Sequence, residues 1–126
     1  SVAAMNWKQY GLAQARGAID AVLRQYGLDG DARAMYVLCI SEAASNMLIH
    51  GGGAGRLSLR ALDDRLRAVL SDHGPGLNFV NWMEPPEADG QASMGYGLKI
   101  ILDNLDTVGL HTGETGTTLL LDHITT

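Results

Sequence analysis

Hydrophobic residues near the start of the chain recur with the period of an α-helix. The range from Trp7 to Tyr26 has apolar side chains at every third or fourth position. They are Leu12, Ala15, Ile19, Val22 and Leu23. This spacing predicts an amphipathic helix with one buried side. Gly27 is expected to end it, because glycine adopts the left-handed conformation that closes many helices.

A second helix is predicted from Ala32 to His50. Asp29 or Asp31 can cap its start, since a short acidic side chain can accept a hydrogen bond from the first free backbone N–H groups. The run Gly51-Gly52-Gly53 is expected to stop it.

Strict alternation of apolar and polar residues predicts a β-hairpin next. Arg56–Leu62 has Leu57, Leu59 and Ala61 on one face. The alternation resumes at Leu66, Ala68 and Leu70. Asp63-Asp64 would form the two-residue turn between the strands.

The rest of the chain combines a long aperiodic segment with one more helix and one more hairpin. The segment from His73 to Met94 has three prolines and no period, which favours a functional loop or lid. A helix is predicted to restart near Gly97, followed by strands at Thr107–His111 and Thr117–Leu121. This order predicts an α+β fold: a two-layer sandwich of a mostly antiparallel sheet with three helices on one face.

Composition limits the classes of protein to consider. With 126 residues, 46% of them hydrophobic, residues 1–126 are expected to form a single domain. A net charge of −5 argues against nucleic-acid binding, and no apolar run reaches the roughly 18 residues of a membrane span. A lone Cys39, interpreted as a small buried hydrophobe, and the lack of a signal-peptide pattern favour a reducing, cytoplasmic location. The chain begins without Met, which favours a shortened chain or a domain cut from a longer protein.

The second helix contains the first group of residues with candidate chemistry. Ser41 and Ser45 are four positions apart, as are Glu42 and Asn46, so these polar groups share one stripe of an otherwise apolar helix. A buried carboxylate needs a cation, water or ligand. The alternative is an ordinary ion pair for Glu42 and a simple hydrogen bond for Asn46.

A second candidate group follows the first hairpin, in the sequence Asp72-His73-Gly74-Pro75-Gly76. An aspartate at a strand end can accept a hydrogen bond from an amino group such as that of adenine. Gly74 and Gly76 would let the backbone turn close to a flat ligand. The same residue types also make ordinary turns.

Two further motifs lie near the C-terminus. Small residues precede an apolar helix in the sequence Ser93-Met94-Gly95-Tyr96-Gly97-Leu98-Lys99-Ile100. The free N–H groups at the start of such a helix can bind phosphates. Gly116-Thr117-Thr118 opens the last strand, although threonine is also a common strand former.

Together, in this order, the four motifs resemble those of the Bergerat-type ATPases, the GHKL superfamily that includes gyrase, heat-shock-90 chaperones and histidine kinases. Ser41-Glu42-Ala43-Ala44-Ser45-Asn46-Met47-Leu48-Ile49-His50-Gly51 is most similar to the first motif of the anti-sigma-factor serine/threonine kinases of bacterial partner switching. The resemblance covers roughly residues 32 to 122. It implies ATP and Mg²⁺ as cofactors. It also implies a strand before the first helix, for which only Ser1–Met5 remains, so the chain would be shortened at this strand.

The resemblance also implies individual roles. Glu42 would be the catalytic general base, Asn46 would hold Mg²⁺ and the nucleotide, and Asp72 would contact the adenine amino group. The remaining nucleotide-binding residues would be Gly74, Gly76, Gly95, Gly97, Leu98, Lys99 and Thr117. His50, which ends the same stripe, is interpreted as a solvated helix-end histidine.

The resemblance implies an antagonist protein of the STAS type as phosphorylation substrate, and it allows a sigma factor and a second copy of the chain as further partners. Yet no Lys or Arg lies between Arg67 and Lys99, where the family's kinases generally carry a basic residue. Two alternatives therefore stay open: a non-catalytic ATP-dependent binding module, and the catalytic domain of a sensor histidine kinase.

Overall fold

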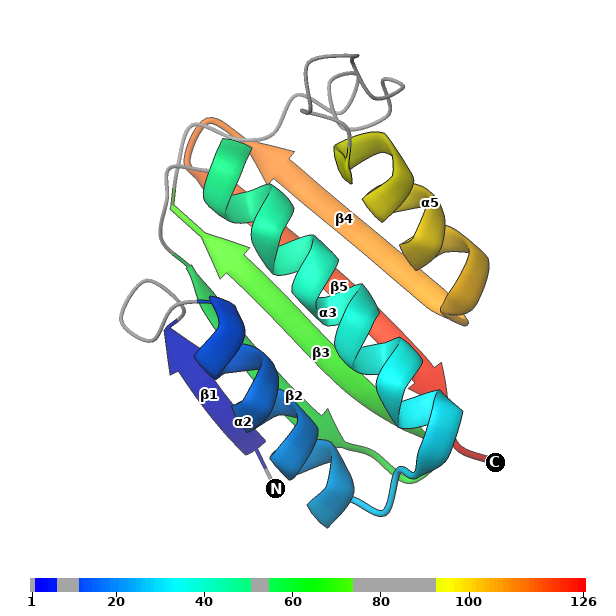
Figure 1. Ribbon diagram of the computed structural model, residues 1–126. Helices are drawn as coiled ribbons and strands as arrows, with labels where there is room; N and C mark the ends of the chain where they lie inside the picture. Colours follow the sequence, from blue (N-terminus) through cyan, green and yellow to red (C-terminus); the bar gives the residue numbers. More distant parts are fainter. Residues whose placement is uncertain (1, 7–11, 51–54, 74–92) are drawn as a thin grey trace.

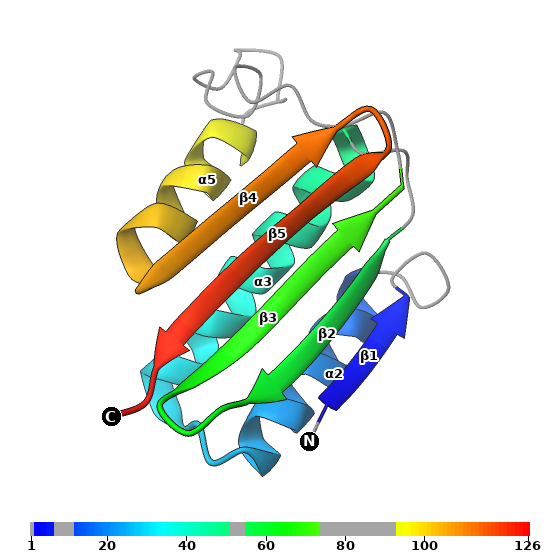
Figure 2. The ribbon, with the colours of Figure 1, turned by 180° about the vertical axis from the view of Figure 1, so that it is seen from behind.

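Two layers make up the protein, a sheet and a set of helices on one of its faces (Figure 1). The computed structural model describes residues 2–6, 12–50, 55–73 and 93–126, with side chains described for 14–47, 55–73 and 99–126. Seen from behind, the strands lie in front of the first two described helices, and the last helix stands beside the edge of the sheet (Figure 2). The predicted α+β sandwich with three helices on one face is confirmed.

Helix α2 (Leu12–Gln25) and helix α3 (Gly30–His50) are joined by a tight turn that the sequence explains. Gly27 has φ +87°, its N–H donates to Arg24 O at 3.0 Å, and Leu28 N–H donates to Leu23 O at 3.0 Å. These two bonds form a Schellman motif, which satisfies carbonyls that the end of α2 leaves free. The predicted role of Gly27 is therefore confirmed.

Five strands form one fully antiparallel sheet within the described residues, in the order β1-β2-β3-β5-β4. Their bounds are β1 Val2–Asn6, β2 Arg56–Ala61, β3 Arg65–Asp72, β4 Thr107–Gly113 and β5 Gly116–Ile124. Both predicted hairpins are present, and a short first strand does precede α2. Leu57 and Leu59 are buried, whereas Ala61, the last residue of β2, is exposed although it follows in the same alternation.

Helix α5 (Ser93–Asn104) begins earlier than the predicted start near Gly97. Glycine disfavours a helix interior by about 1 kcal/mol relative to alanine, which is why the sequence alone suggests a later start. Helix α5 packs against α3, and such tertiary packing outweighs local propensity. Strand β4 and strand β5 also extend further than predicted.

The core lies between the layers and takes side chains from every described helix and from β2, β3 and β5. Tyr36 of α3 is buried, and its hydroxyl donates to Leu121 O at 2.7 Å and lies 3.1 Å from Leu66 O. Cys39 is fully buried, as predicted. Among the described helices, none has the length and apolar character needed to cross a membrane.

Candidate functional site

The elements that carry the sequence motifs meet at one end of the sandwich. The C-terminal end of α3, the end of β3, the start of β5 and the N-terminal end of α5 all lie at the top of the view in Figure 1. The antiparallel pairing of β3 with β5 produces part of this arrangement, since the last residue of one strand lies opposite the beginning of the other.

Asp72 lies on the helix-covered face of the sheet. Strand β3 alternates between half-buried and buried positions, and Asp72 continues the buried series of Leu66, Ala68 and Leu70. It is 5% exposed. A carboxylate in such a place requires hydrogen-bond donors, because burial without them is costly.

Thr117 supplies one of these donors. The register pairs it with Asp72, and its backbone N–H donates to Asp72 Oδ1 at 3.2 Å. Thr117 is itself buried, and its hydroxyl lies 2.9 Å from the Thr112 hydroxyl on β4. The structure thus brings together two of the predicted nucleotide-binding residues, from motifs 45 positions apart.

Gly116 allows β5 to approach Asp72 this closely. Its φ is +145°, a backbone conformation that residues with a side chain rarely adopt. A Cβ atom at this position would collide with the carbonyl oxygen of Asp72 and lie 3.2 Å from His73 Cα. A glycine is therefore required beside the Asp72 carboxylate.

Helix α3 presents its polar stripe at the same end of the molecule. Asn46 is 2% exposed, and no described residue bonds its Nδ2 atom; the buried Ser41 hydroxyl likewise has no partner among the described residues. Which end of an asparagine amide is oxygen is assigned from its surroundings, so this amide can direct either a donor or an acceptor at a ligand. Amide oxygens are ligands that Mg²⁺ accepts. Asn46 therefore fits the Mg²⁺ that the family resemblance implies.

Glu42 lies four residues before Asn46, about one turn of α3 away, but unlike Asn46 it is only half-buried. Its charge acts on Cys39: burial, and then the nearby Glu42 carboxylate, raise the pKa of the Cys39 thiol to about 11. Cys39 therefore stays a neutral thiol at physiological pH. Glu42, which is only half-buried, is the acidic group of this part of α3 that a ligand can reach.

The glycine motif of α5 lies in the first turns of that helix. Gly95, Gly97 and Leu98 all have helical backbone. Gly95 lies in the first turn, where N–H groups have no partner within the helix and can bind an anion, whereas Gly97 and Leu98 follow it, where helical N–H groups bond carbonyls four residues earlier. Lys99 is exposed and its Nζ lies 3.0 Å from Asp103 Oδ2. Any contact between Lys99 and a phosphate requires breaking this pair, which at such exposure is worth only about 0.3–0.5 kcal/mol.

Some predicted site residues fall outside this description. Gly74 and Gly76 lie outside the described residues, and the side chain of His50 is likewise not described. The contacts of all the named residues with a nucleotide stay predictions. In the part of the chain that is described, no group of three or more His, Cys, Asp or Glu side chains could hold a metal ion.

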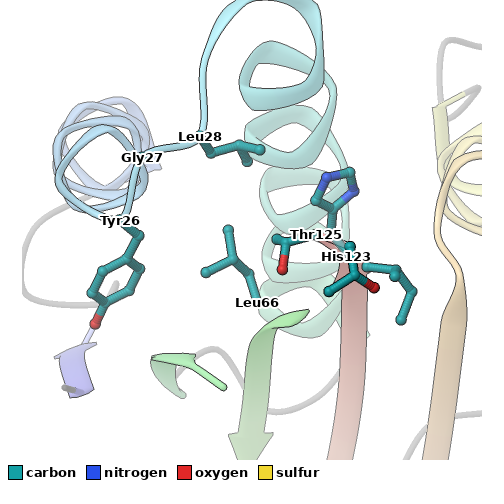
Figure 3. Close-up of a pocket in the computed structure, with 8 residues that line it drawn as sticks. Tyr26, Gly27, Leu28, Leu66, His123 and Thr125 are labelled. Atoms are coloured by element: carbon teal, nitrogen blue, oxygen red, sulfur yellow. The ribbon is translucent and has the colours of Figure 1, made fainter. Parts of the chain in front are cut away.

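A hollow of about 300 Å³ lies at the opposite end of the sandwich, where the chain turns from α2 to α3 (Figure 3). Its lining residues include Tyr26, Leu28, Leu66 and His123. The His123 ring packs against Tyr36 with centroids 5.7 Å apart. None of the four sequence motifs contributes to this hollow.

A two-layer sandwich with these motifs gathered at one end defines a nucleotide-binding domain of the GHKL type. The comparison with protein families agrees: the family model of the histidine kinase-like ATPase domain matches residues 8–122. The chain therefore belongs to the family of histidine kinase-like ATPase domains, and membership implies ATP binding. A comparison with curated proteins finds no significant match.

Sequence reasoning missed two features near the site. Thr112 escaped notice, although the alternation of β4 and its register opposite Thr117 could have identified it. The steric reason for Gly116 could not be found, since it depends on the carbonyl of a residue 44 positions earlier, Asp72.

Proposed function

We propose that this chain is a regulatory serine/threonine kinase of the anti-sigma-factor type, which uses ATP and Mg²⁺ to phosphorylate a STAS-type antagonist protein. The observation that carries its ATP-binding part is the buried Asp72 carboxylate, which accepts a hydrogen bond from Thr117 N–H. It lies at the end of the sandwich where Asn46 Nδ2 has no partner among the described residues. The kinase subtype is supported by the sequence from Ser41 to Gly51.

In this proposal each residue has a distinct task. Asp72 accepts a hydrogen bond from the adenine amino group, and Thr117 keeps that carboxylate in place through its backbone N–H. Asn46 supplies an oxygen to Mg²⁺, and the metal, when bound, supplies positive charge that stabilises the transferred phosphoryl group. Glu42 accepts the proton of the substrate hydroxyl, for which a half-buried carboxylate is accessible.

ATP binding is tested by calorimetric titration of wild type and Asp72→Asn with ATP and Mg²⁺. The asparagine keeps one acceptor oxygen for Thr117 but replaces the other with an NH₂ group, which cannot accept from adenine. We expect affinity to fall by about tenfold or more, or 1.4 kcal/mol. Asp63→Asn, in the exposed turn between β2 and β3, is the control and should bind like wild type. Equal affinities for Asp72→Asn and wild type would remove Asp72 from the site.

Phosphoryl transfer needs a separate experiment. Radiolabelled ATP should label a serine or threonine of a STAS-type antagonist, and Glu42→Gln should reduce the labelling rate by about 10²-fold or more without abolishing ATP binding. Glu114→Gln, in the exposed turn between β4 and β5, is the matched control. If the chain binds ATP but labels no antagonist, the kinase proposal is contradicted and the nucleotide site is not.

A non-catalytic ATP-dependent binding module is the second candidate. It is favoured by the absence of Lys and Arg between Arg67 and Lys99 and by the pairing of Lys99 with Asp103. Phosphoryl transfer depends on positive charge around the γ-phosphate, so a protein with little of it would bind ATP without transferring phosphate. Partner binding that requires ATP, with no phosphorylated product, would distinguish this function from the kinase.

A further inference from the structure

The face of the sheet turned away from the helices has a chemistry of its own. No described helix covers it (Figure 2). We use the name open sheet face for the outward positions of the strands, centred on the adjacent residues Ser58, Val69, Leu120 and Gly109. None of the four sequence motifs accounts for the residues gathered there.

The centre of the open sheet face is apolar and has few protruding side chains. Val69 of β3 and Leu120 of β5 are register partners, and both are half-buried. On the far side of Leu120 lies Gly109, its register partner on β4, which has no side chain to protrude from the surface. A hollow of about 220 Å³ adjoins this centre, lined by Arg56, Leu57, Ser58, Val69 and Ser71.

Positive charge surrounds this apolar centre. Strand β2 contributes Arg56 and Arg60, which are exposed and form no ion pair with a described residue. Strand β3 contributes Arg65 and Arg67, which both bond Asp122. Arg65 also pairs with Asp64 in the turn between the two strands, at 3.0 Å. Four arginines against these two aspartates leave a surplus of two positive charges, matching Arg56 and Arg60, in a chain whose net charge is −5.

This charge distribution restricts the kind of occupant. A second copy of the chain, docked symmetrically through the same face, would bring two positively charged surfaces together, which is unfavourable. A nucleic acid is disfavoured by the overall negative charge. An acidic peptide fits, since its carboxylates can pair with Arg56 and Arg60 while apolar side chains cover Val69 and Leu120.

We propose that the open sheet face binds an acidic segment of a partner protein that also carries apolar side chains. This site is separate from the proposed nucleotide site, although the two share strands: Ser71 and Thr118 point to the open face directly beside Asp72 and Thr117. Arg56 and Arg60 attract the acidic side chains of the segment. Val69 and Leu120 provide apolar surface from which water is removed on binding.

Fluorescence anisotropy with a labelled peptide of four Glu-Leu repeats tests the proposal. Wild type should bind it, with affinity that falls as salt rises. The variant Arg56→Glu/Arg60→Glu should bind about tenfold or more weakly, because two attractive charges become repulsive. The control Arg16→Glu/Arg24→Glu makes the same charge change on exposed positions of α2 and should stay within about twofold of wild type.

Further measurements test the apolar contact, the location of the charges and a membrane surface as the occupant. A peptide with Ser in place of Leu should bind several-fold more weakly than the Glu-Leu peptide, and equal binding would overturn the apolar part of the proposal. Equal weakening by both arginine variants would show that only net charge matters and would overturn the site. Vesicles of phosphatidylcholine and phosphatidylglycerol that bind with the same arginine dependence, when the peptide does not, would assign the face to a membrane surface instead. All variants carry exposed substitutions, and circular dichroism should show the wild-type spectrum.

Discussion

Gly116 and Asp72 illustrate how the candidate site depends on single atoms. The carbonyl oxygen of Asp72 occupies the space where any larger residue at position 116 would place its Cβ atom. The neighbouring Thr117 N–H then reaches the Asp72 carboxylate. The backbone of β5 therefore helps to position the buried carboxylate.

We predict that Gly116→Ala destabilises the protein by about 2–4 kcal/mol, because it combines a strained φ of +145° with a backbone collision. Urea unfolding measures the change. The control is Gly113→Ala at the opposite side of the same turn, where no heavy atom lies within 4 Å of an added Cβ. A similar stability for the two variants would contradict the proposed contact.

Strand β3 has different chemistry on its two faces. Its inward positions end in Asp72, and its outward arginines bond Asp122 of β5, whose side chain is 0% exposed. Arg67 Nε lies 2.9 Å from Asp122 Oδ1, and Arg65 Nη1 lies 3.0 Å from Oδ2. These ion pairs therefore link β3 to β5 on the face that no described helix covers.

This cluster should make stability depend on pH. Burial by itself raises the pKa of the Asp122 carboxyl, but hydrogen bonds from Arg67 and Arg65 outweigh it and hold the pKa below its usual value. A group with a lowered folded-state pKa adds stability above its unfolded pKa of about 3.9, and this stability is lost as pH falls through the folded value. The contribution should therefore be complete at pH 7 and decrease below about pH 4.

We predict that Asp122→Asn lowers the free energy of unfolding at pH 7 by about 1–3 kcal/mol. This is less than a fully buried ion pair would give, because Arg65 and Arg67 are 25% and 33% exposed and can regain water. The difference from wild type should shrink on acidification. Urea unfolding at pH 7 and at pH 3 measures both values, and a constant difference would contradict the titration of Asp122.

At the scale of the whole molecule, the candidate site is held together by several elements rather than one. Residues of α3, β3 and β5, with the first turns of α5, lie at one end of the sandwich (Figure 1). A ligand that contacts all of them binds only the folded chain and stabilises it.

ATP with Mg²⁺ at about 100 times its dissociation constant should stabilise the fold by about 2.7 kcal/mol, or roughly 10 °C in the melting temperature of a chain of this size. Scanning calorimetry measures the shift. Removing Mg²⁺ with EDTA should abolish most of it, and Asp72→Asn should reduce it at the same ATP concentration. An unchanged melting temperature at saturating ATP and Mg²⁺ would contradict the convergence of these elements on one nucleotide.

Sequence periodicity predicted the order of the elements well where local pattern and burial coincide. The alternation of Leu66, Ala68 and Leu70 identified β3 and its buried face, and Gly27 identified the end of α2. The start of α5 was placed too late because glycines near Gly97 have low local helix propensity, whereas packing on α3 depends on distant residues. Fold class follows from such patterns because it depends on which residues avoid water.

The sequence by itself determined the layers, the hairpins and the residues that carry candidate chemistry, because hydrophobic period and turn residues act over a few positions. Only the tertiary structure decided which of these residues meet: Thr117 with Asp72, Gly116 against the Asp72 carbonyl, and Asp122 under Arg65 and Arg67. These contacts join positions 44 to 57 residues apart, and they depend on strand register, which is set by the packing of the whole sheet.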